Sequence, residues 1–337
     1  MAQFKIVQTS APPGAVLTDE REGLAEFADC VVTYGPLTTP AQLIEHCRDA
    51  DALLVPGARF TREVINSLEK CRALVRYGIG YDTIDVDAAT DHGLVVVNIP
   101  DFCQPEVANH ALAHLLNCAK KIVRLDDWMR AGGWSKEGRP AFLTPMGPLH
   151  GETIGLVGFG QIAREFYRRL QVLDMRVIAY DPYVPAERAA ALGVEMLPLD
   201  EVLRRSDYVS IHVPLTKETR RLIDARALSL MKPTAYLINT SRGPIVDEQA
   251  LIAALQSGQI AGAGLDVFEV EPLSADSPLL KMDNVVLTPH TASYADETFR
   301  IMRRRVGEEA ARALRGQMPN TPVNPQVRPK LSWLNEQ

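Results

Sequence analysis

The chain has 337 residues, 46% of them hydrophobic and 23% charged, which is the composition of an ordinary globular protein long enough for two domains. Its 36 Lys and Arg stand against 42 Asp and Glu, and the formal net charge of -6 excludes a general electrostatic attraction to nucleic acid or anionic membranes. Five scattered cysteines, without CxxC spacing, are typical of reduced thiols, and no apolar run approaches the roughly 18 residues of a membrane span. We therefore expect a cytoplasmic protein without a signal peptide.

Short apolar runs alternate with helix-like segments along most of the chain, which predicts βαβ units and mostly parallel sheets. In a first block, strands are predicted at 4–10, 51–56, 73–78 and 94–99. One long helix, predicted at 105–132, leads into a second block that begins near Glu152. At least six strands are predicted there, in the segments TIGLVGFG, MRVIAYD, YVSIHVPL, AYLINTS, AGAGLDVF and NVVLTPH. A last helix, at about 296–314, is predicted to return the chain to the first block.

The segment GLVGFGQIA places Gly158, Gly160 and Ala163 at the spacing G-x-G-x-x-G/A. Such a turn, between a strand and a helix predicted at 161–173, lets backbone amides approach a pyrophosphate, whereas the same glycines alone indicate only a tight turn. Asp181 ends the next strand, 21 residues after Gly160, where a carboxylate can bind the adenosine ribose hydroxyls. Because that carboxylate repels a 2′-phosphate, the sequence favours NAD over NADP. The predicted contacts of the turn are Gly158, Phe159, Gly160, Gln161 and Ile162.

Three later segments carry polar residues at the ends of apolar strands: NTSRG with Arg242, LDVFEVEP with Asp266 and Glu271, and LTPHTAS with His290. Taken singly, Arg242 could be a surface ion-pair partner, Glu271 a solvated acid and His290 an ordinary loop histidine. Ligands of open α/β sheets bind beyond the carboxyl ends of strands, so these positions can meet. We expect Gly243 to hold Arg242 in a tight turn by adopting backbone angles that other residues avoid.

Together these residues suit hydride transfer between a nicotinamide and a 2-hydroxy acid. The reaction needs a cation for the substrate carboxylate and an acid/base group for its hydroxyl, and Arg242 and His290 are of the required types. A carboxylate such as Glu271 beside the imidazole favours its protonated form, which is the form that carbonyl reduction uses.

The chain resembles the D-isomer-specific 2-hydroxyacid dehydrogenases over nearly its whole length, most specifically in the run INTSRGPIVDEQALIAALQSGQIAGAGLDVFEVEP. This family includes glyoxylate/hydroxypyruvate reductases, phosphoglycerate, formate and phosphite dehydrogenases, and the C-terminal-binding-protein corepressors. The resemblance implies that Arg242, Glu271 and His290 are catalytic, and that Asp266 helps to hold the nicotinamide. It also implies cofactor contacts at His212, Pro214 and Thr240, and substrate binding by Arg242 and by the main-chain amides near Ile79 and Gly80.

The same resemblance implies an α/β architecture of two doubly wound parallel-sheet domains, a Rossmann NAD-binding domain inserted in a flavodoxin-like substrate domain. We place the substrate domain at 1–102 and 295–337 and the NAD-binding domain at 103–294. The family further favours a homodimer formed through the crossover region, which is the helical segment predicted at 105–132 between the two blocks. Substrate specificity is expected from the loops near 56–60 and 77–81, and from the C-terminal VRPKLSWLNEQ of a partner subunit.

Two other functions stay open. The crossover PDFCQPEVANHA is similar to that of the corepressor branch, whose members sense NAD(H) and bind proteins, and phosphite dehydrogenases use similar residues. His110 and His114 have the spacing of helical metal ligands but no evident third ligand, so we interpret them as interface or packing residues and predict no metal site. Cys103 is interpreted as a buried small hydrophobe.

Overall fold

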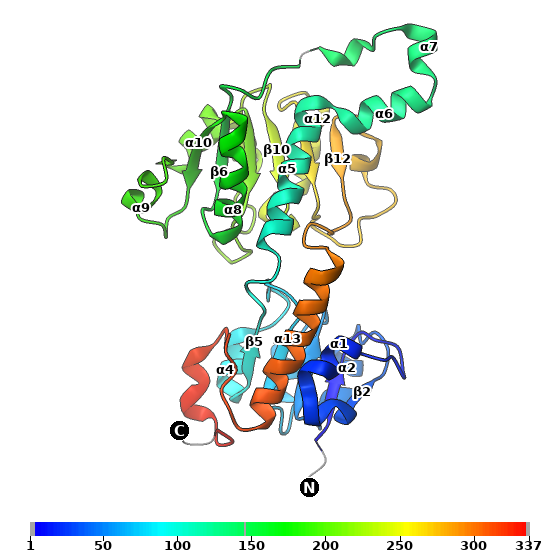
Figure 1. Ribbon diagram of the computed structural model, residues 1–337, viewed down its shortest axis with the longest axis vertical. Coiled ribbons are helices and arrows are strands. Elements are labelled where there is room, and N and C mark those ends of the chain that lie inside the picture. The colour runs from blue at the N-terminus through cyan, green and yellow to red at the C-terminus, as the bar shows by residue number, and fades with distance from the viewer. Residues whose placement is uncertain (1–3, 145, 335–337) are drawn as a thin grey trace. The chain divides into compact units, whose positions relative to one another are not determined.

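The computed structural model describes residues 4–144 and 146–334 and divides into two compact units. Unit 1 is Met1–Phe102 with Ala295–Gln337, and unit 2 is Cys103–Tyr294 (Figure 1). The last three residues of the C-terminal segment that we connect with specificity lie outside the described residues.

Unit 1 is built on a five-stranded parallel sheet in the order β2-β1-β3-β4-β5. That order is the flavodoxin-like one, as predicted. Its strands are β1 (Ile6–Gln8), β2 (Val31–Thr33), β3 (Ala52–Val55), β4 (Ala73–Arg76) and β5 (Val95–Val97). Its helices are α1 (Thr18–Leu24), η1 (Ala25–Cys30), α2 (Pro40–Cys47), α3 (Arg62–Asn66), α4 (Val86–His92), α13 (Asp296–Leu314) and η6 (Pro325–Lys330).

Unit 2 contains a seven-stranded parallel sheet in the order β12-β11-β10-β9-β6-β7-β8, with the order reversing between β6 and β9 as in a Rossmann domain. Its strands are β6 (Thr153–Val157), β7 (Arg176–Tyr180), β8 (Glu195–Met196), β9 (Tyr208–Ile211), β10 (Tyr236–Asn239), β11 (Gly262–Leu265) and β12 (Val285–Leu287). Its helices are α5 (Gln104–Lys120), α6 (Ile122–Arg130), α7 (Gly133–Glu137), η2 (Ala141–Leu143), α8 (Gln161–Leu170), η3 (Gln171–Leu173), α9 (Ala186–Ala190), α10 (Leu199–Arg205), α11 (Ala225–Leu230), η4 (Gly243–Ile245), α12 (Glu248–Gln256) and η5 (Pro278–Lys281).

The central strands of both sheets are buried on both faces, and this explains their near-continuous apolar sequences. The two strands that the sequence did not predict are the short edge strands β2 and β8, whose residues are partly exposed or exposed. In unit 2, α5 packs beside α8 and against β10, β11 and β12 (Figure 1). The inner face of α5 therefore lies over the strands that end in the predicted catalytic segments.

The single long helix predicted at 105–132 is wrong, because the chain turns at Lys121. Lys121 has a left-handed backbone (φ 53°) and separates α5 from α6. Its amide donates to the Asn117 carbonyl, and the Asn117 side-chain oxygen accepts from the amide of Val123 at 3.0 Å. Asn117 thus satisfies backbone groups on both sides of the break, which the apolar periodicity does not reveal.

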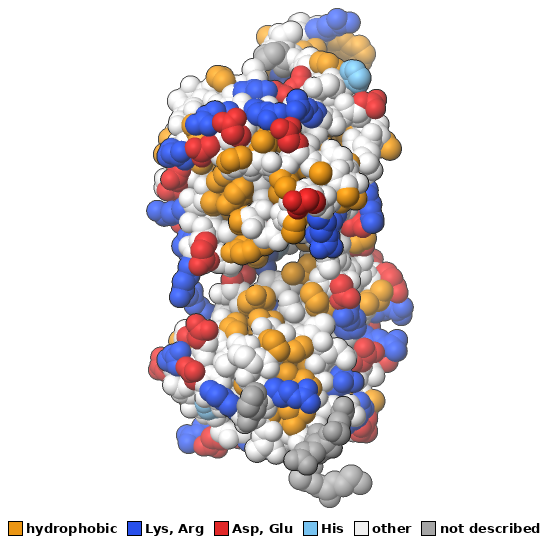
Figure 2. All heavy atoms as spheres, turned by 90° about the vertical axis from the view of Figure 1, so that its left-hand side faces the viewer, with side chains coloured by type: hydrophobic (Ala, Val, Ile, Leu, Met, Phe, Trp, Pro, Cys, Tyr) orange, Lys and Arg blue, Asp and Glu red, His pale blue; other side chains and the backbone are white. Residues whose placement is uncertain are grey.

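All five cysteines are free thiols, and Cys103 is buried as expected. None of the helices in the described ranges combines the length and the apolarity needed to cross a bilayer. On the face drawn in Figure 2, basic and acidic side chains are interspersed rather than gathered by sign. The cytoplasmic location stays a prediction.

Candidate active site

The turn after β6 has the geometry that its glycines predict. Gly158 has a φ of 98°, a backbone conformation that side chains with a Cβ rarely adopt, and a Cβ there would lie 2.9 Å from the backbone of His212. Gly160 precedes α8, and no side chain caps the first turn of that helix. The predicted contacts beside it are the buried Phe159, the exposed Gln161 and the partly buried Ile162.

Asp181 lies just beyond β7 and holds this turn in place. One of its carboxylate oxygens accepts from the Phe159 amide and the other from the Tyr183 amide, each at 2.9 Å. A carboxylate is therefore fixed beside the Gly158 turn, at the carboxyl end of the sheet.

The residues predicted beside the cofactor on β9 and β10 differ in their surroundings. His212 follows β9, its Nε2 lies 2.9 Å from the Ser210 hydroxyl, and burial lowers the pKa of His212 to about 3, so the ring is neutral. Pro214 is exposed. Thr240 is only 8% exposed, and its hydroxyl has no hydrogen-bond partner among the described residues.

Arg242 follows β10 in a turn that Asn239 closes. The Asn239 side chain donates to the Arg242 carbonyl and accepts from the Ser241 amide, both at 3.0 Å. Gly243 is not among the positive-φ residues, so our expectation of unusual backbone angles there is wrong. The glycine is needed for space instead, because a Cβ at Gly243 would lie 1.9 Å from the backbone of Phe268. The Arg242 turn thus packs directly on the segment that leads to Glu271.

Glu271 and His290 form a close pair, with His290 Nδ1 2.6 Å from Glu271 Oε2. The other Glu271 oxygen accepts from the Phe268 amide at 3.0 Å. Burial opposes the charge on Glu271, but the hydrogen bonds from His290 and Phe268 and the positive charge of Arg242 outweigh it and lower the pKa of Glu271. The carboxylate is therefore ionised, and it orients an imidazole whose side chain is 45% exposed.

Proteins of similar sequence indicate the family to which the chain belongs. Residues 112–292 match the model of the NAD-binding domain of the D-isomer specific 2-hydroxyacid dehydrogenases. A glyoxylate reductase of Korarchaeum cryptofilum is 42% identical over 286 residues, which are 85% of this chain and 86% of that protein. The chain belongs to the D-isomer specific 2-hydroxyacid dehydrogenase family.

Two further relatives of the dehydrogenase differ in what their names say they act on. A D-3-phosphoglycerate dehydrogenase of Methanocaldococcus jannaschii is 38% identical over 303 residues, or 89% of this chain and 56% of that longer protein. The crystal structure of an NADPH-dependent glyoxylate/hydroxypyruvate reductase from Sinorhizobium meliloti, in complex with NADP and malonate, is 32% identical with a TM-score of 0.84. The match covers 96% of this chain and 97% of the reductase chain. The predicted family, fold class and enzyme class, an NAD-dependent D-2-hydroxyacid dehydrogenase, are confirmed.

The dehydrogenase has the features that a nicotinamide dinucleotide requires. A Cβ built on Gly160 would meet no atom within 4 Å, so the turn leaves open space before the uncapped first turn of α8. The buried and unpaired Thr240 hydroxyl is a further group that a ligand could satisfy. These residues fit the pyrophosphate and the rest of a dinucleotide.

The predicted substrate amides of the dehydrogenase lie in unit 1, just beyond the carboxyl end of β4. Gly78 has a φ of 103° and its carbonyl accepts from the Ile99 amide at 3.0 Å, while the Ile79 carbonyl accepts from the Asn98 side chain at 2.7 Å. These bonds orient the backbone at Ile79 and Gly80, whose role in substrate binding stays a prediction.

The sequence did not reveal which groups His110 and His114 contact. Both rings reach from α5 to the hydroxyl of Thr288, with Nε2 to Oγ1 distances of 2.8 and 3.1 Å. Thr288 in turn donates to Asp266, which is 0% exposed. Their spacing on one face of a helix was visible in the sequence, but the strand end that this face covers was not.

Proposed function

We propose that the dehydrogenase reduces a small 2-oxo acid to its D-2-hydroxy acid with NADH, and catalyses the reverse reaction with NAD. The observation that carries this proposal is the 2.6 Å contact between His290 and Glu271, beside the turn that holds Arg242. In a family defined by 2-hydroxy acids, these are the acid/base, orienting and carboxylate-binding groups that the reaction requires.

Each group has one task in this proposal. His290 Nδ1 donates to Glu271, which leaves Nε2 for the substrate, and in the imidazolium form the Nε2 proton passes to the substrate carbonyl oxygen during reduction. Arg242 binds the substrate carboxylate, assisted by the amides near Ile79 and Gly80. When bound, a nicotinamide would supply a hydride for the carbonyl carbon, and this hydride with the proton from His290 would balance the conversion of the oxo acid to the hydroxy acid.

The cofactor preference proposed here is for NAD(H). Asp181 presents a carboxylate beside the Gly158 turn, fixed by two backbone amides, and this negative charge disfavours a 2′-phosphate. Asp266 is buried, and its carboxylate accepts from the amides of Thr291 and Ala292 in the loop after β12, which supports a contribution to the nicotinamide site through that loop rather than through an exposed carboxylate.

Glyoxylate and hydroxypyruvate come first in the test, because the names of two relatives contain them. We expect NADH oxidation with at least one acid of a panel of glyoxylate, hydroxypyruvate, pyruvate and longer 2-oxo acids, and a higher kcat/KM for NADH than for NADPH. Steady-state absorbance assays measure both quantities. NADH binding without turnover of any acid contradicts the proposal and favours an NAD(H)-sensing interaction protein, whereas phosphite-dependent NAD reduction identifies a phosphite dehydrogenase.

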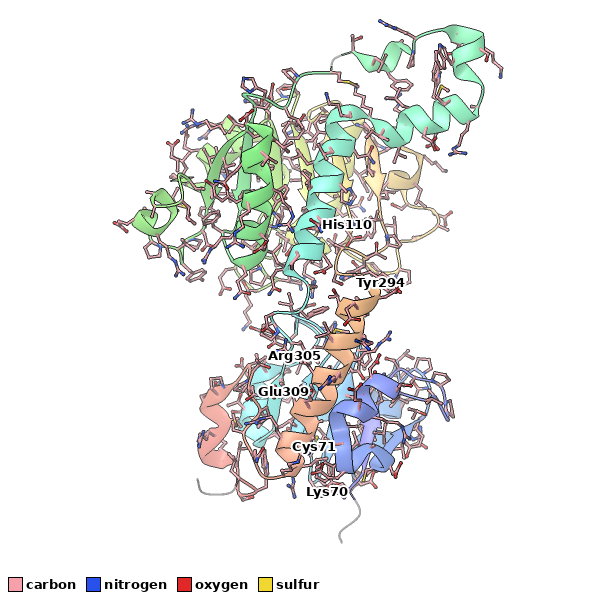
Figure 3. The ribbon with its side chains drawn as sticks, viewed as in Figure 1. Lys70, Cys71, His110, Tyr294, Arg305 and Glu309 are labelled. Atoms are coloured by element: carbon pink, nitrogen blue, oxygen red, sulfur yellow. The ribbon has the colours of Figure 1, made fainter. Side chains whose placement is uncertain are left out.

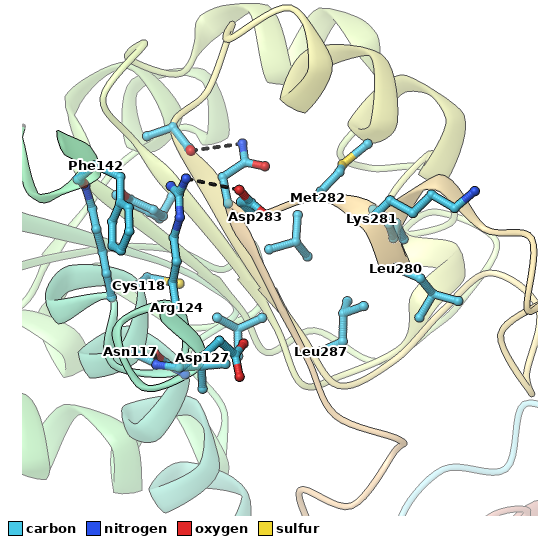
Figure 4. Close-up of a pocket in the computed structure, with 18 of the residues that line it drawn as sticks. Asn117, Cys118, Arg124, Asp127, Phe142, Leu280, Lys281, Met282, Asp283 and Leu287 are labelled. Carbon is cyan, nitrogen blue, oxygen red and sulfur yellow. Dashed lines mark hydrogen bonds and ion pairs between the residues drawn. The ribbon is translucent and has the colours of Figure 1, made fainter. Parts of the chain in front are cut away.

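We also propose a homodimer formed through the crossover region of unit 2. Helix α6 buries none of its residues in this chain, and exposed apolar side chains continue from it to α7: Ile122, Val123, Met129 and Trp134 are 56, 47, 46 and 66% exposed. Beside α6 lies a pocket of about 820 Å³ that is spanned by the 3.1 Å ion pair of Arg124 with Asp283 (Figure 4). Such a patch is typical of a surface that another chain covers.

The dimer prediction can be tested by sedimentation velocity. The protein is expected to sediment as a dimer, and Trp134→Ser is expected to raise the dimer dissociation constant at least tenfold, because it removes the largest exposed apolar side chain of the patch. Tyr183→Ser is the matched control, since Tyr183 is an 87% exposed aromatic residue away from α6 and α7. A monomeric wild-type protein, or equal effects of both variants, contradicts the prediction.

A further inference from the structure

A cluster of four side chains lies behind the loop that carries His290. It consists of His110 and His114 on α5, Thr288 at the end of β12 and Asp266 after β11, and is called here the Thr288 cluster. Figure 3 shows His110 on α5, the helix that packs on β11 and β12. A Cβ at Gly264 would lie 2.8 Å from His114 Nδ1, so a glycine in β11 makes room for the second ring.

The numbers of donors and acceptors determine where the protons of this cluster lie. The Thr288 hydroxyl donates to Asp266 Oδ1 at 2.6 Å, so its oxygen can only accept from the two rings. Both His110 and His114 must therefore donate from Nε2, at 2.8 and 3.1 Å. Burial, followed by the nearby His110, lowers the pKa of His114 to about 4, so this ring is neutral near pH 7. Thr288 consequently uses its one donor and both acceptor positions within the cluster.

Asp266 transmits this arrangement to the His290 loop. Its carboxylate accepts from the amides of Thr291 and Ala292 at 2.9 and 2.8 Å, and its carbonyl accepts from the His290 amide at 2.8 Å. Burial opposes the charge on Asp266, but hydrogen bonds from His110, Thr288 and the two amides lower its pKa. The loop is thus attached to one buried carboxylate on both sides of His290.

The backbone of His290 needs such support. Its φ of 53° lies in the left-handed region, which costs a residue other than glycine about 1 to 2 kcal/mol. A conformation of this kind persists where surrounding contacts determine it. Here the left-handed backbone of His290 is held by the contacts of Asp266 with the loop and of Thr288 with Asp266.

We propose that Thr288, held by His110 and His114, is a positioning residue that acts through Asp266 to set the place of the acid/base His290. This inference rests on the function proposed above for His290. It assigns to the histidine pair on α5 a contribution to the catalytic step, in place of the packing role that the sequence indicated.

The test compares Thr288→Val with Thr288→Ser. Valine keeps the volume but removes the hydroxyl, so that His114 Nε2 loses its partner, His110 Nε2 keeps only Asp266 Oδ1 at 3.4 Å, and Asp266 loses one of its donors, whereas serine keeps the hydroxyl. We expect Thr288→Val to lower kcat about 10- to 100-fold, with KM for the oxo acid and Kd for NADH changed less than threefold, because small misplacements of catalytic groups act mainly on the reacting step. Thr288→Ser is expected to restore kcat to within about threefold of the wild-type value.

A second readout separates positioning from loss of stability. A loosened His290 loop weakens the contact with Glu271, so the pH at which kcat for reduction falls by half should move downward in Thr288→Val. Thr90→Val is the matched control: its hydroxyl donates to the Val86 carbonyl at 2.8 Å in unit 1, and its loss should lower Tm without changing the pH profile. If Thr288→Val does not fold, His110→Leu against His110→Gln makes the same comparison, since glutamine retains an N–H donor.

Two outcomes distinguish this inference from the proposed function. Wild-type kcat and pH profile in Thr288→Val or His110→Leu, together with an inactive His290→Ala, overturn the positioning role and leave the function intact. Substantial turnover by His290→Ala removes the function on which the inference rests.

Discussion

His290→Ala is expected to lower kcat for 2-oxo acid reduction by about 10²- to 10⁴-fold, the range that general acid/base groups contribute. The reason is that Nδ1 is committed to Glu271 and Nε2 belongs to a 45% exposed side chain, so the ring can exchange its proton with substrate and then with solvent. Binding of NADH should be retained, because the Gly158 turn is built from other segments. Stopped-flow turnover and NADH fluorescence titration measure the two quantities separately.

Glu271→Gln is the companion of this variant, because it keeps the size of the side chain and removes only its charge. We expect a smaller loss of kcat than in His290→Ala, and an activity that falls at lower pH than in the wild-type enzyme. Glu271 itself does not titrate at the pH where the activity falls. Its folded pKa lies below the ordinary 4.5, so its stabilising contribution is complete above pH 4.5 and is lost only as the pH falls through the lower folded value.

The result for His290 has a clear contrary outcome. If His290→Ala keeps more than about a tenth of the wild-type kcat, a general acid of the usual 10²- to 10⁴-fold contribution is not lost, and the proton must come from another group or from water. A parallel loss of NADH binding would point instead to a collapsed loop. In that case the loss of activity would say little about proton transfer.

The sequence predicted most of the fold because the central strands are buried on both faces. Continuous apolar runs such as those of β3 and β5 are hard to mistake when helical segments separate them. Edge strands give no such signal, and β8 consists only of Glu195 and Met196. The break after α5 escaped prediction because it depends on a left-handed Lys121 and on one side-chain hydrogen bond of Asn117, neither of which disturbs the apolar period.

The candidate site was predictable where residues follow strands, and less so where packing decides. Arg242, Glu271 and His290 each come after a strand of one parallel sheet, so the topology alone brings their segments to one edge. The need for Gly243 comes from the later approach of Phe268, a contact distant in sequence. The contact of His114 with Thr288 likewise depends on the packing of α5 on β11 and β12, which the sequence does not reveal.

Arg242→Ala is expected to lower kcat/KM for 2-oxo acids by about 10³-fold, which corresponds to roughly 4 kcal/mol of transition-state stabilisation. The Asn239 bridge and the close approach of Phe268 to Gly243 hold the backbone of this turn, so the guanidinium is presented with less loss of entropy than a mobile side chain would suffer. Both KM and kcat should change, because the arginine binds the carboxylate and orients the carbonyl. Arg242→Lys keeps the charge but loses the planar fork of the guanidinium. Its kcat/KM is expected to lie between those of the wild-type enzyme and of Arg242→Ala.

Chemical rescue can separate a direct role of Arg242 from a structural one. Guanidinium ion at millimolar concentration should raise the activity of Arg242→Ala, because a free cation can occupy the vacated position, and it should leave Arg226→Ala unchanged. Arg226 is the control because it is an exposed arginine paired with Asp200, a surface ion pair of the kind that contributes little. If Arg242→Ala retains wild-type kcat/KM, the arginine serves only the charge balance of Glu271. If the loss cannot be rescued and is accompanied by a lower Tm, the Asn239 turn needs this side chain for its own stability.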